Sequence, residues 1–269
     1  MSQAKPQKKS SGFPWAIVVM VVALVVSILV YKFVFGDVSH FLDADRKEPK
    51  PGDFLGIIYK GGPIVPILMS MFLLVITFSI ERFLTIMRAK GSGSLEGFLQ
   101  KTKTLLHNKD INGAISECNR QKGAVANVVV EGLKKYQEME NNSVLTHEQK
   151  VQAIQQEIEE ATTLELPSLQ ENMPILATIA SVATLVALLG TVIGMIKAFA
   201  ALATTGNPDP AALAAGISEA LINTAIGIGT SAFAIIFYNV FTTQIDSLTY
   251  GIDEIGFSIA QTFNSTQKK

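Results

Sequence analysis

Residues 174–196 read PILATIASVATLVALLGTVIGMI, and this stretch contains no Asp, Glu, Lys or Arg. Three further runs, residues 15–31, 64–80 and 220–243, are equally free of these charges. A helix needs about 20 apolar residues to cross a bilayer, and four runs of about 17–24 residues meet that length. Overall, only 17% of the 269 residues are charged, whereas soluble domains average about 25%. We therefore predict an all-α membrane protein with four transmembrane helices, a helical cytoplasmic domain and long helices that extend from the membrane.

The first of these runs follows Lys5, Lys8 and Lys9 and so superficially resembles a secretory signal peptide. Its apolar stretch, however, is longer than the usual signal core of about 7–15 residues. No cleavage site of the small-x-small kind follows it, because the chain continues Tyr31-Lys32-Phe33-Val34-Phe35-Gly36. We therefore expect a retained membrane helix rather than a cleaved signal.

Positive charges near the membrane predict the orientation. Arg82, Arg88 and Lys90 follow the second span closely, and Lys and Arg near membrane helices favour the cytoplasmic side. The N-terminus, the region after the second span and the C-terminus are thus expected in the cytoplasm. The predicted segments are a cytoplasmic tail 1–14, a transmembrane helix 15–36, a periplasmic segment 37–62, a transmembrane helix 63–88, a cytoplasmic helical domain 89–173, a transmembrane helix 174–204, a periplasmic loop 205–210, a transmembrane helix 211–244 and a cytoplasmic tail 245–269.

Composition and motifs argue against several functional classes. The net charge is −1, so the chain lacks the excess of positive charge that is typical of nucleic-acid-binding proteins. Cys118 is the single cysteine, so neither a disulfide framework nor a cysteine metal site is expected. His107, His147 and the nearby glutamates raise the alternative of a metal site, but a solvated helix face explains them better, and we predict none. No nucleophile–base pattern or nucleotide-binding loop occurs, so we expect neither an enzyme nor a cofactor.

The region between the second and third spans has clear helix boundaries. Ser94 is placed to cap a helix, and a second short helix is expected over about residues 110–121. Thr146-His147-Glu148-Gln149 fits a capping box that begins a long polar helix. Pro167 and Pro174 should kink this helix or mark its entry into the membrane, because proline removes a backbone donor.

The third and fourth spans each have a polar face on a helical wheel of about 100° per residue. The candidate pore-lining residues on these faces are Ser181, Thr184, Thr191, Asn223, Thr224, Thr230 and Ser231. Small and hydroxyl residues are also common where membrane helices pack. Ordinary helix packing therefore remains the alternative for these residues.

Glu219 and Lys197 are harder to explain by packing. An ionisable group at membrane depth is costly and usually faces a bundle interior or water. The two residues lie at comparable depth on either side of the predicted loop 205–210, so a Lys197–Glu219 ion pair is one expectation. The alternative is that the long side chain of Lys197 extends to the outer interface.

Three segments resemble the ExbB/TolQ/MotA family. Leu188–Met195, which reads LLGTVIGM, is similar to the family's LFGTVxGI segment. Ala215–Leu221 followed by Thr224–Gly227 resembles GIxEALxxTAIGL, and Ile235–Asn239 resembles the family's PAVxxYN ending. Glu81-Arg82 also fits the family at the inner end of the second span.

The resemblance implies an inner-membrane proton-channel subunit of the ExbB type. Such subunits form a homopentamer around two single-span helices of an ExbD-like partner, and through a TonB-like protein they energise outer-membrane transport. By resemblance, Thr191 and Thr224 line the proton path and Glu219 is the family's glutamate in the last span, whereas the titrating Asp belongs to the partner. The helix 15–36 and Lys197 depart from the ExbB pattern. A TolQ-like subunit for envelope maintenance and a passive membrane scaffold remain the alternatives.

Overall fold

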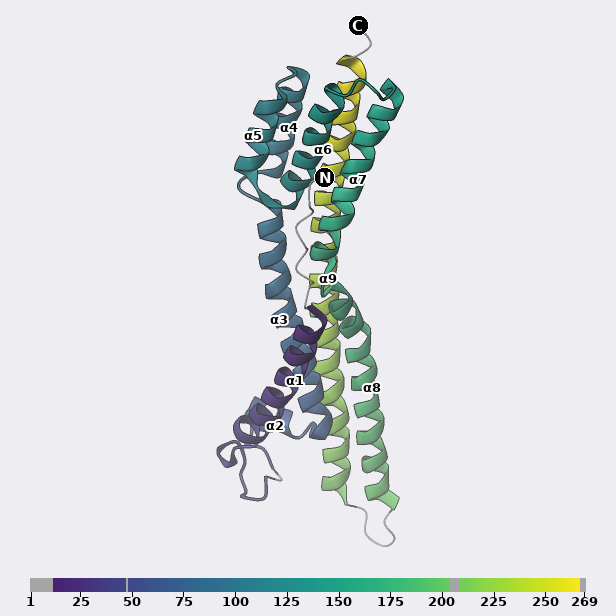
Figure 1. Ribbon diagram of the computed structural model, residues 1–269. Helices are drawn as coiled ribbons and strands as arrows, with labels where there is room; N and C mark the ends of the chain where they lie inside the picture. The colour runs from purple at the N-terminus through teal and green to yellow at the C-terminus, as the bar shows by residue number, and fades with distance from the viewer. Residues whose placement is uncertain (1–11, 47, 204–208, 267–269) are drawn as a thin grey trace. The chain divides into compact units, whose positions relative to one another are not determined.

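The computed structural model describes residues 12–46, 48–203 and 209–266. In these residues the chain forms helices joined by turns and loops, and its one isolated bridge pairs Phe41 with Pro49. The helices, shown in Figure 1, are α1 Gly12–Val30, a π-helical turn Tyr31–Phe35, a 3-10 turn Val38–His40, α2 Phe54–Tyr59, a 3-10 turn Gly62–Ile64, α3 Val65–Lys90, α4 Leu95–His107, α5 Ile111–Gln121, α6 Gly123–Glu140, α7 His147–Gln170, α8 Met173–Ala203 and α9 Pro210–Thr266.

Four helical stretches are long and apolar enough to cross a membrane: Trp15–Phe35, Gly62–His107, His147–Ala203 and Pro210–Ser265. The prediction of an all-α protein with four such helices is confirmed. The last three stretches are longer than a bilayer requires, so they continue well beyond the apolar part. The predicted tail 1–14 and loop 205–210 lie largely outside the described residues.

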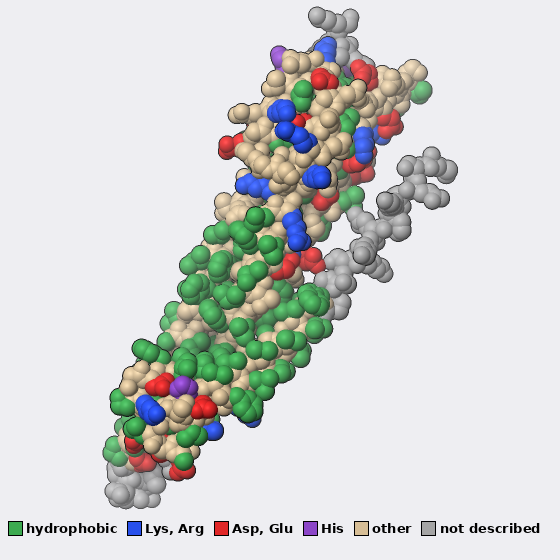
Figure 2. Space-filling view, turned by 90° about the vertical axis from the view of Figure 1, so that its left-hand side faces the viewer, with side chains coloured by type: hydrophobic (Ala, Val, Ile, Leu, Met, Phe, Trp, Pro, Cys, Tyr) green, Lys and Arg blue, Asp and Glu red, His purple; other side chains and the backbone are tan. Residues whose placement is uncertain are grey.

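The chain divides into two compact units. Unit one comprises the described residues up to Ser79 together with Asn172–Tyr238, and unit two comprises Ile80–Glu171 together with the described residues from Asn239 onward. Hydrophobic side chains gather on one part of the surface in Figure 2 and charged side chains on another. The exposed large apolar residues of α1, α8 and the first part of α9 belong to unit one and suit a lipid surface or another apolar helix.

Unit one contains a seam of small residues where α8 and α9 lie side by side (Figure 1). A Cβ atom added to Gly194 would lie 2.8 Å from both the Ala220 nitrogen and the Gly216 oxygen, which is too close for any side chain. On the other faces of these helices Leu185, Leu189 and Ile236 are exposed. The small residues thus allow the two backbones to approach closely, as is usual between membrane helices.

Unit two packs α4, α5, α6 and α7 with the end of α9. Ile154, Leu133 and Phe263 are fully buried there, and the rings of Tyr136 and Phe263 meet edge to face with centroids 4.9 Å apart. In the predicted C-terminal tail 245–269 the chain is helical as far as Thr266, because the apolar stripe of this part of α9 is buried within unit two.

The helix boundaries agree with the sequence signals. Ser94 accepts a hydrogen bond from the Gly97 nitrogen and begins α4, and Thr146 and Gln149 form the predicted capping box of α7. Pro167 lies inside α7, while the break between α7 and α8 falls at Asn172, whose φ is 63°. Both prolines therefore lie near this break without being its turning point.

The segment between α1 and α3 folds against the end of α1. The rings of Tyr31 and Tyr59 stack with centroids 4.7 Å apart, and the Tyr31 hydroxyl donates to the Tyr59 carbonyl at 2.9 Å. Asp53 caps α2 and lies 2.8 Å from Nδ1 of His40, and this hydrogen bond is the main reason that the pKa of Asp53 is lowered. These contacts hold the segment in a defined fold that ends at Gly61 and Gly62.

Candidate functional site

Thr191 of α8 and Thr224 of α9 meet across the seam of unit one, and their hydroxyl groups are directly hydrogen-bonded. Carbonyl acceptors lie beside both: the Ala187 oxygen is 3.1 Å from Thr191 Oγ1, and the Ala220 oxygen is 3.1 Å from Thr224 Oγ1 and 3.4 Å from Thr191 Oγ1. Each hydroxyl has one proton and two acceptor lone pairs. One threonine therefore donates to the other, which donates to a carbonyl, and the order can reverse.

Glu219 and Lys197 face one another from the same two helices. Lys197 Nζ donates to Glu219 Oε1 at 2.6 Å and to Oε2 at 2.9 Å. The Glu219 side chain is only 11% exposed, whereas that of Lys197 is 51% exposed. The ammonium group therefore neutralises a carboxylate that is largely withdrawn from solvent, as intramembrane charges generally require.

Asn223 lies one helical turn after Glu219 and is fully buried. Its amide nitrogen donates to the Gly61 carbonyl at 2.9 Å, whereas its Oδ1 has no hydrogen-bond partner within the described part of the chain. The Gly61 carbonyl only accepts, so the amide nitrogen must face it. Burial of an acceptor without a hydrogen-bond partner costs free energy, so a small donor such as water would be bound favourably at this oxygen.

The other predicted pore-lining residues are not equivalent in the structure. Ser231 is buried and donates to the Ala180 carbonyl of α8, and Thr230 is buried and donates to Ile226 of its own helix at 2.9 Å. Ser181 is exposed, and Thr184 is partly exposed. Asn223, Thr230 and Ser231 thus face the interior of the folded chain, while Thr191 and Thr224 remain partly exposed at the seam.

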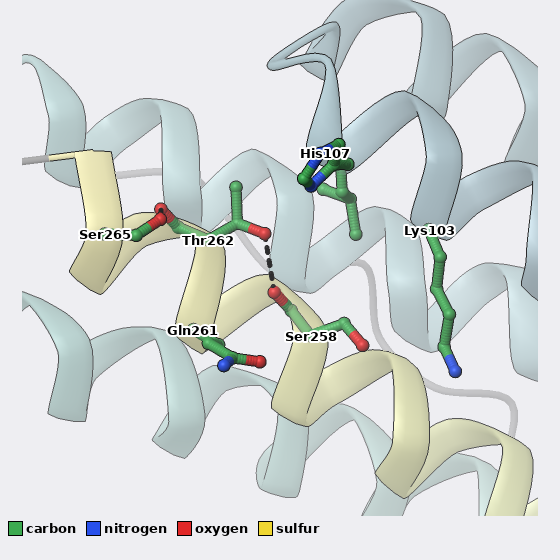
Figure 3. A pocket seen from close by; sticks show the side chains of 7 residues that line it. Lys103, His107, Ser258, Gln261, Thr262 and Ser265 are labelled. Carbon is green, nitrogen blue, oxygen red and sulfur yellow. Dashed lines mark hydrogen bonds between the residues drawn. The ribbon is translucent and has the colours of Figure 1, made fainter.

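The two histidines considered for a metal site have different neighbours in unit two. His147 stacks on Phe263 and contacts Asn264 at 2.8 Å, and His107 lines an open cavity of about 420 Å³ between α4 and α9 (Figure 3). The cavity's Ser258, Thr262 and Ser265 hydroxyls donate to carbonyls of their own helix. Within the described ranges no three His, Cys, Asp or Glu side chains are grouped to hold a metal ion.

The seam lies within a region that is similar to known proteins. Residues 121–254, which include Thr191, Thr224, Glu219, Lys197 and Asn223, match the family described as the MotA/TolQ/ExbB proton channel family. The chain carries a MotA/TolQ/ExbB family domain. The resemblance predicted from the three sequence segments is confirmed.

Relatives of two kinds within the MotA/TolQ/ExbB family are similar to this chain. The Tol-Pal system protein TolQ of Pseudomonas aeruginosa is 41% identical over 88 residues, which are 33% of this chain and 38% of that protein. The TolQ of Haemophilus influenzae is 40% identical over 98 residues, or 35% and 43% of the two chains. The biopolymer transport protein ExbB of Salmonella typhimurium is 37% identical over 84 residues, or 31% and 34%. The matches thus span less than half the length of these relatives, at similar identity for both names.

Sequence reasoning missed two features of this site. The Gly61 carbonyl that binds Asn223 lies 162 residues away along the chain, so no local pattern indicates it. The close approach of the Gly61-Gly62 turn to the polar face of α9 was also missed. Adjacent glycines directly before an apolar helix were the available signal, because such pairs often mark tight turns or close backbone contacts.

Proposed function

We propose that the protein is an inner-membrane proton-channel subunit of the ExbB type that uses the proton motive force to energise transport across the outer membrane. The observation that carries this proposal is the hydrogen-bonded pair Thr191–Thr224 beside the neutralised Glu219, within otherwise apolar helices. The family domain supports ion conduction. The absence of a nucleophile–base arrangement in the sequence fits a conducting rather than a catalytic role.

The threonine pair supplies a relay because a hydroxyl accepts and donates at once. A proton arriving on one oxygen releases the hydroxyl proton toward the second oxygen, and the second hydroxyl then releases its own proton. The carbonyls of Ala187 and Ala220 hold the hydroxyls between transfers. Glu219, paired with Lys197, sets the local field without adding net charge to the apolar surroundings.

The proposed assembly is a homo-oligomer, a pentamer by resemblance, around two helices of an ExbD-like partner whose Asp takes up the proton. A TonB-like protein would couple this motion to the outer membrane. Lipid would cover the exposed apolar faces of unit one. With both chain ends on the cytoplasmic side, segment 37–62 and the Lys197–Glu219 pair would lie toward the periplasm.

A TolQ-like role in envelope maintenance is the second candidate, because relatives named TolQ match as well as those named ExbB. The two roles differ in phenotype. Loss of siderophore or vitamin uptake on deletion of the gene supports the ExbB role, whereas detergent sensitivity and leakage of periplasmic proteins support the TolQ role.

The test of proton conduction is Thr224→Val in the complex purified with its single-span partner and reconstituted into vesicles. Valine keeps the shape but removes the hydroxyl, so we expect normal assembly and proton uptake reduced by at least about tenfold, equivalent to about 1.4 kcal/mol in the barrier. Thr224→Ser restores a hydroxyl and should retain most of the uptake. Uptake by Thr224→Val equal to that of the unmodified chain would favour a passive scaffold instead.

A further inference from the structure

The turn formed by Gly61 and Gly62 lies directly against the polar face of α9. Asn223 Nδ2 donates to the Gly61 carbonyl at 2.9 Å, and the Asn223 side chain is fully buried. A Cβ atom added to Gly61 would lie 2.7 Å from Cγ2 of Ile222. The turn is therefore held against α9 by one hydrogen bond. In addition, the Gly61 backbone lies so close to Ile222 that a side chain at position 61 would not fit.

Gly62 approaches the Glu219 side chain in the same way. A Cβ atom at Gly62 would lie 2.9 Å from the Glu219 Cδ and closer still to Oε1, a separation that real Cβ atoms essentially never show. The φ of Gly62 is also +75°, which L side chains rarely adopt. Position 62 thus needs glycine both for its backbone conformation and for the space that the carboxylate occupies.

The Glu219 carboxylate thus has two close neighbours. The Gly62 backbone lies beside it, and Lys197 Nζ donates to both of its oxygens. Only 11% of the Glu219 side chain is exposed. A side chain at position 62 would therefore occupy the space of the carboxylate and displace it from its present position.

We propose that the Gly61-Gly62 turn, held by Asn223, is a positioning element that keeps the Glu219 carboxylate against Lys197. The turn precedes α3, so the segment between α1 and α3 controls the geometry of an ion pair formed by α8 and α9. Its importance for conduction rests on the proposed function of Glu219. The positioning itself concerns only this chain and is testable without conduction.

The experiment compares Gly62→Ala with Gly52→Ala in the full chain in membranes. Gly52 lies in the same segment and has a φ of +81°, but a Cβ atom there meets nothing within 4 Å. Both substitutions impose the same kind of backbone strain, and only Gly62→Ala collides with Glu219. The readout is the rate at which a carbodiimide modifies the peptide that contains Glu219 at a fixed pH of 7, since an ammonium group held against the carboxylate protects it from the reagent.

We expect Gly62→Ala to raise the rate of Glu219 modification by about tenfold, because a carboxylate displaced from the ammonium group loses the ion pair that protects it. Gly52→Ala should leave the rate unchanged, and Lys197→Met should give the full increase. Asn223→Ala, which releases the turn without adding an atom, should change the rate in the same direction and covers the case in which Gly62→Ala does not fold.

A rate unchanged in Asn223→Ala and in folded Gly62→Ala, or raised equally in Gly52→Ala, would overturn the positioning role. The proposed function has a separate readout. If the modification rate rises as expected while proton uptake by the reconstituted complex stays at the unmodified level, the positioning inference stands and Glu219 has no part in conduction.

Discussion

Glu219 in unit one and Glu117 in unit two are buried carboxylates stabilised by nearby cations. Lys197 donates to both oxygens of Glu219, and Glu117 accepts from Lys101 at 2.7 Å and from Arg120. Burial alone raises the pKa of Glu117, but the hydrogen bonds from Lys101 and Arg120 outweigh it, so the pKa lies below its ordinary value. A buried charge with such partners stabilises the fold only while it remains ionised.

The first residue-scale prediction concerns Glu117→Gln. A depressed folded-state pKa contributes stability above the unfolded value of about 4.3 and loses it as the pH falls through the folded value. We therefore expect Glu117→Gln to destabilise unit two by on the order of 1 kcal/mol at pH 7, with the difference from the unmodified chain vanishing at acid pH. Denaturant unfolding of the chain in detergent at pH 7 and at a series of pH values below 4 measures this.

A matched control is Glu131→Gln, because the Glu131–Lys134 pair is solvent-exposed on both sides. Exposed pairs contribute little, so Glu131→Gln should change stability by much less than Glu117→Gln at pH 7. Equal effects of the two substitutions, or an effect of Glu117→Gln that grows as the pH falls, would contradict the assignment.

The sequence could predict the types of residue at the site but not all of their contacts. Helical periodicity and the family segments together indicate Thr191, Thr224 and Glu219 from the amino-acid sequence alone. The same periodicity groups Asn223 with Thr224, yet Asn223 binds Gly61 while Thr224 meets Thr191. Periodicity describes one helix face, whereas the partner of each residue depends on which other segment covers that face.

Among the elements, the end of α7 depends on a buried arginine of α3. Arg82 is 1% exposed, pairs with Glu81, and donates from one terminal nitrogen to the carbonyls of Ser168 at 3.2 Å and Leu169 at 3.3 Å. Carbonyls in the last turn of a helix have no partner within the helix. The sequence indicated Arg82 as a topology signal and as a feature of the family. It did not indicate these contacts, since the carbonyls that Arg82 binds become available only where α7 ends.

The element-scale prediction is therefore Arg82→Lys. One ammonium group cannot satisfy Glu81 and two separate carbonyls as a planar guanidinium does, so we expect a loss of about 2–4 kcal/mol and a lower midpoint of heat-induced aggregation of the purified chain. Arg88→Lys on the exposed face of the same helix should leave the midpoint unchanged. Equal midpoints for the two variants would argue against the capping role of Arg82.

At the scale of the whole molecule, α9 supplies residues to both units. Its residues as far as Tyr238 belong to unit one, and those from Asn239 belong to unit two. Buried apolar side chains continue at spacings of three and four residues through Ile245, Leu248, Ile252 and Ile255. That spacing is the signal of a covered helix, and it continues beyond residue 244, where the transmembrane helix was predicted to end.

Cys118, the single cysteine of the chain, lies in unit two, so its reactivity reports on the opening of that unit. Cys118 is buried between α5 and its neighbours, and burial, helped by the nearby Glu117 charge, raises the pKa of its thiol to about 12. Only the thiolate reacts readily. We expect maleimide labelling of the folded chain at pH 8 to be at least about a hundredfold slower than in denaturant, because it must wait for unit two to open.

The pH dependence of this labelling has a definite sign. A thiol whose pKa is raised by folding contributes stability below the unfolded value of about 8.5, and loses it as the pH rises toward the folded value. Labelling should therefore accelerate above about pH 9 more steeply than the thiolate fraction of the denatured chain. Val144→Cys in a Cys118→Ala background supplies the control, since Val144 is 89% exposed and should label at the rate of a free thiol at every pH. Labelling of Cys118 at that same rate in the folded chain would contradict its burial within unit two.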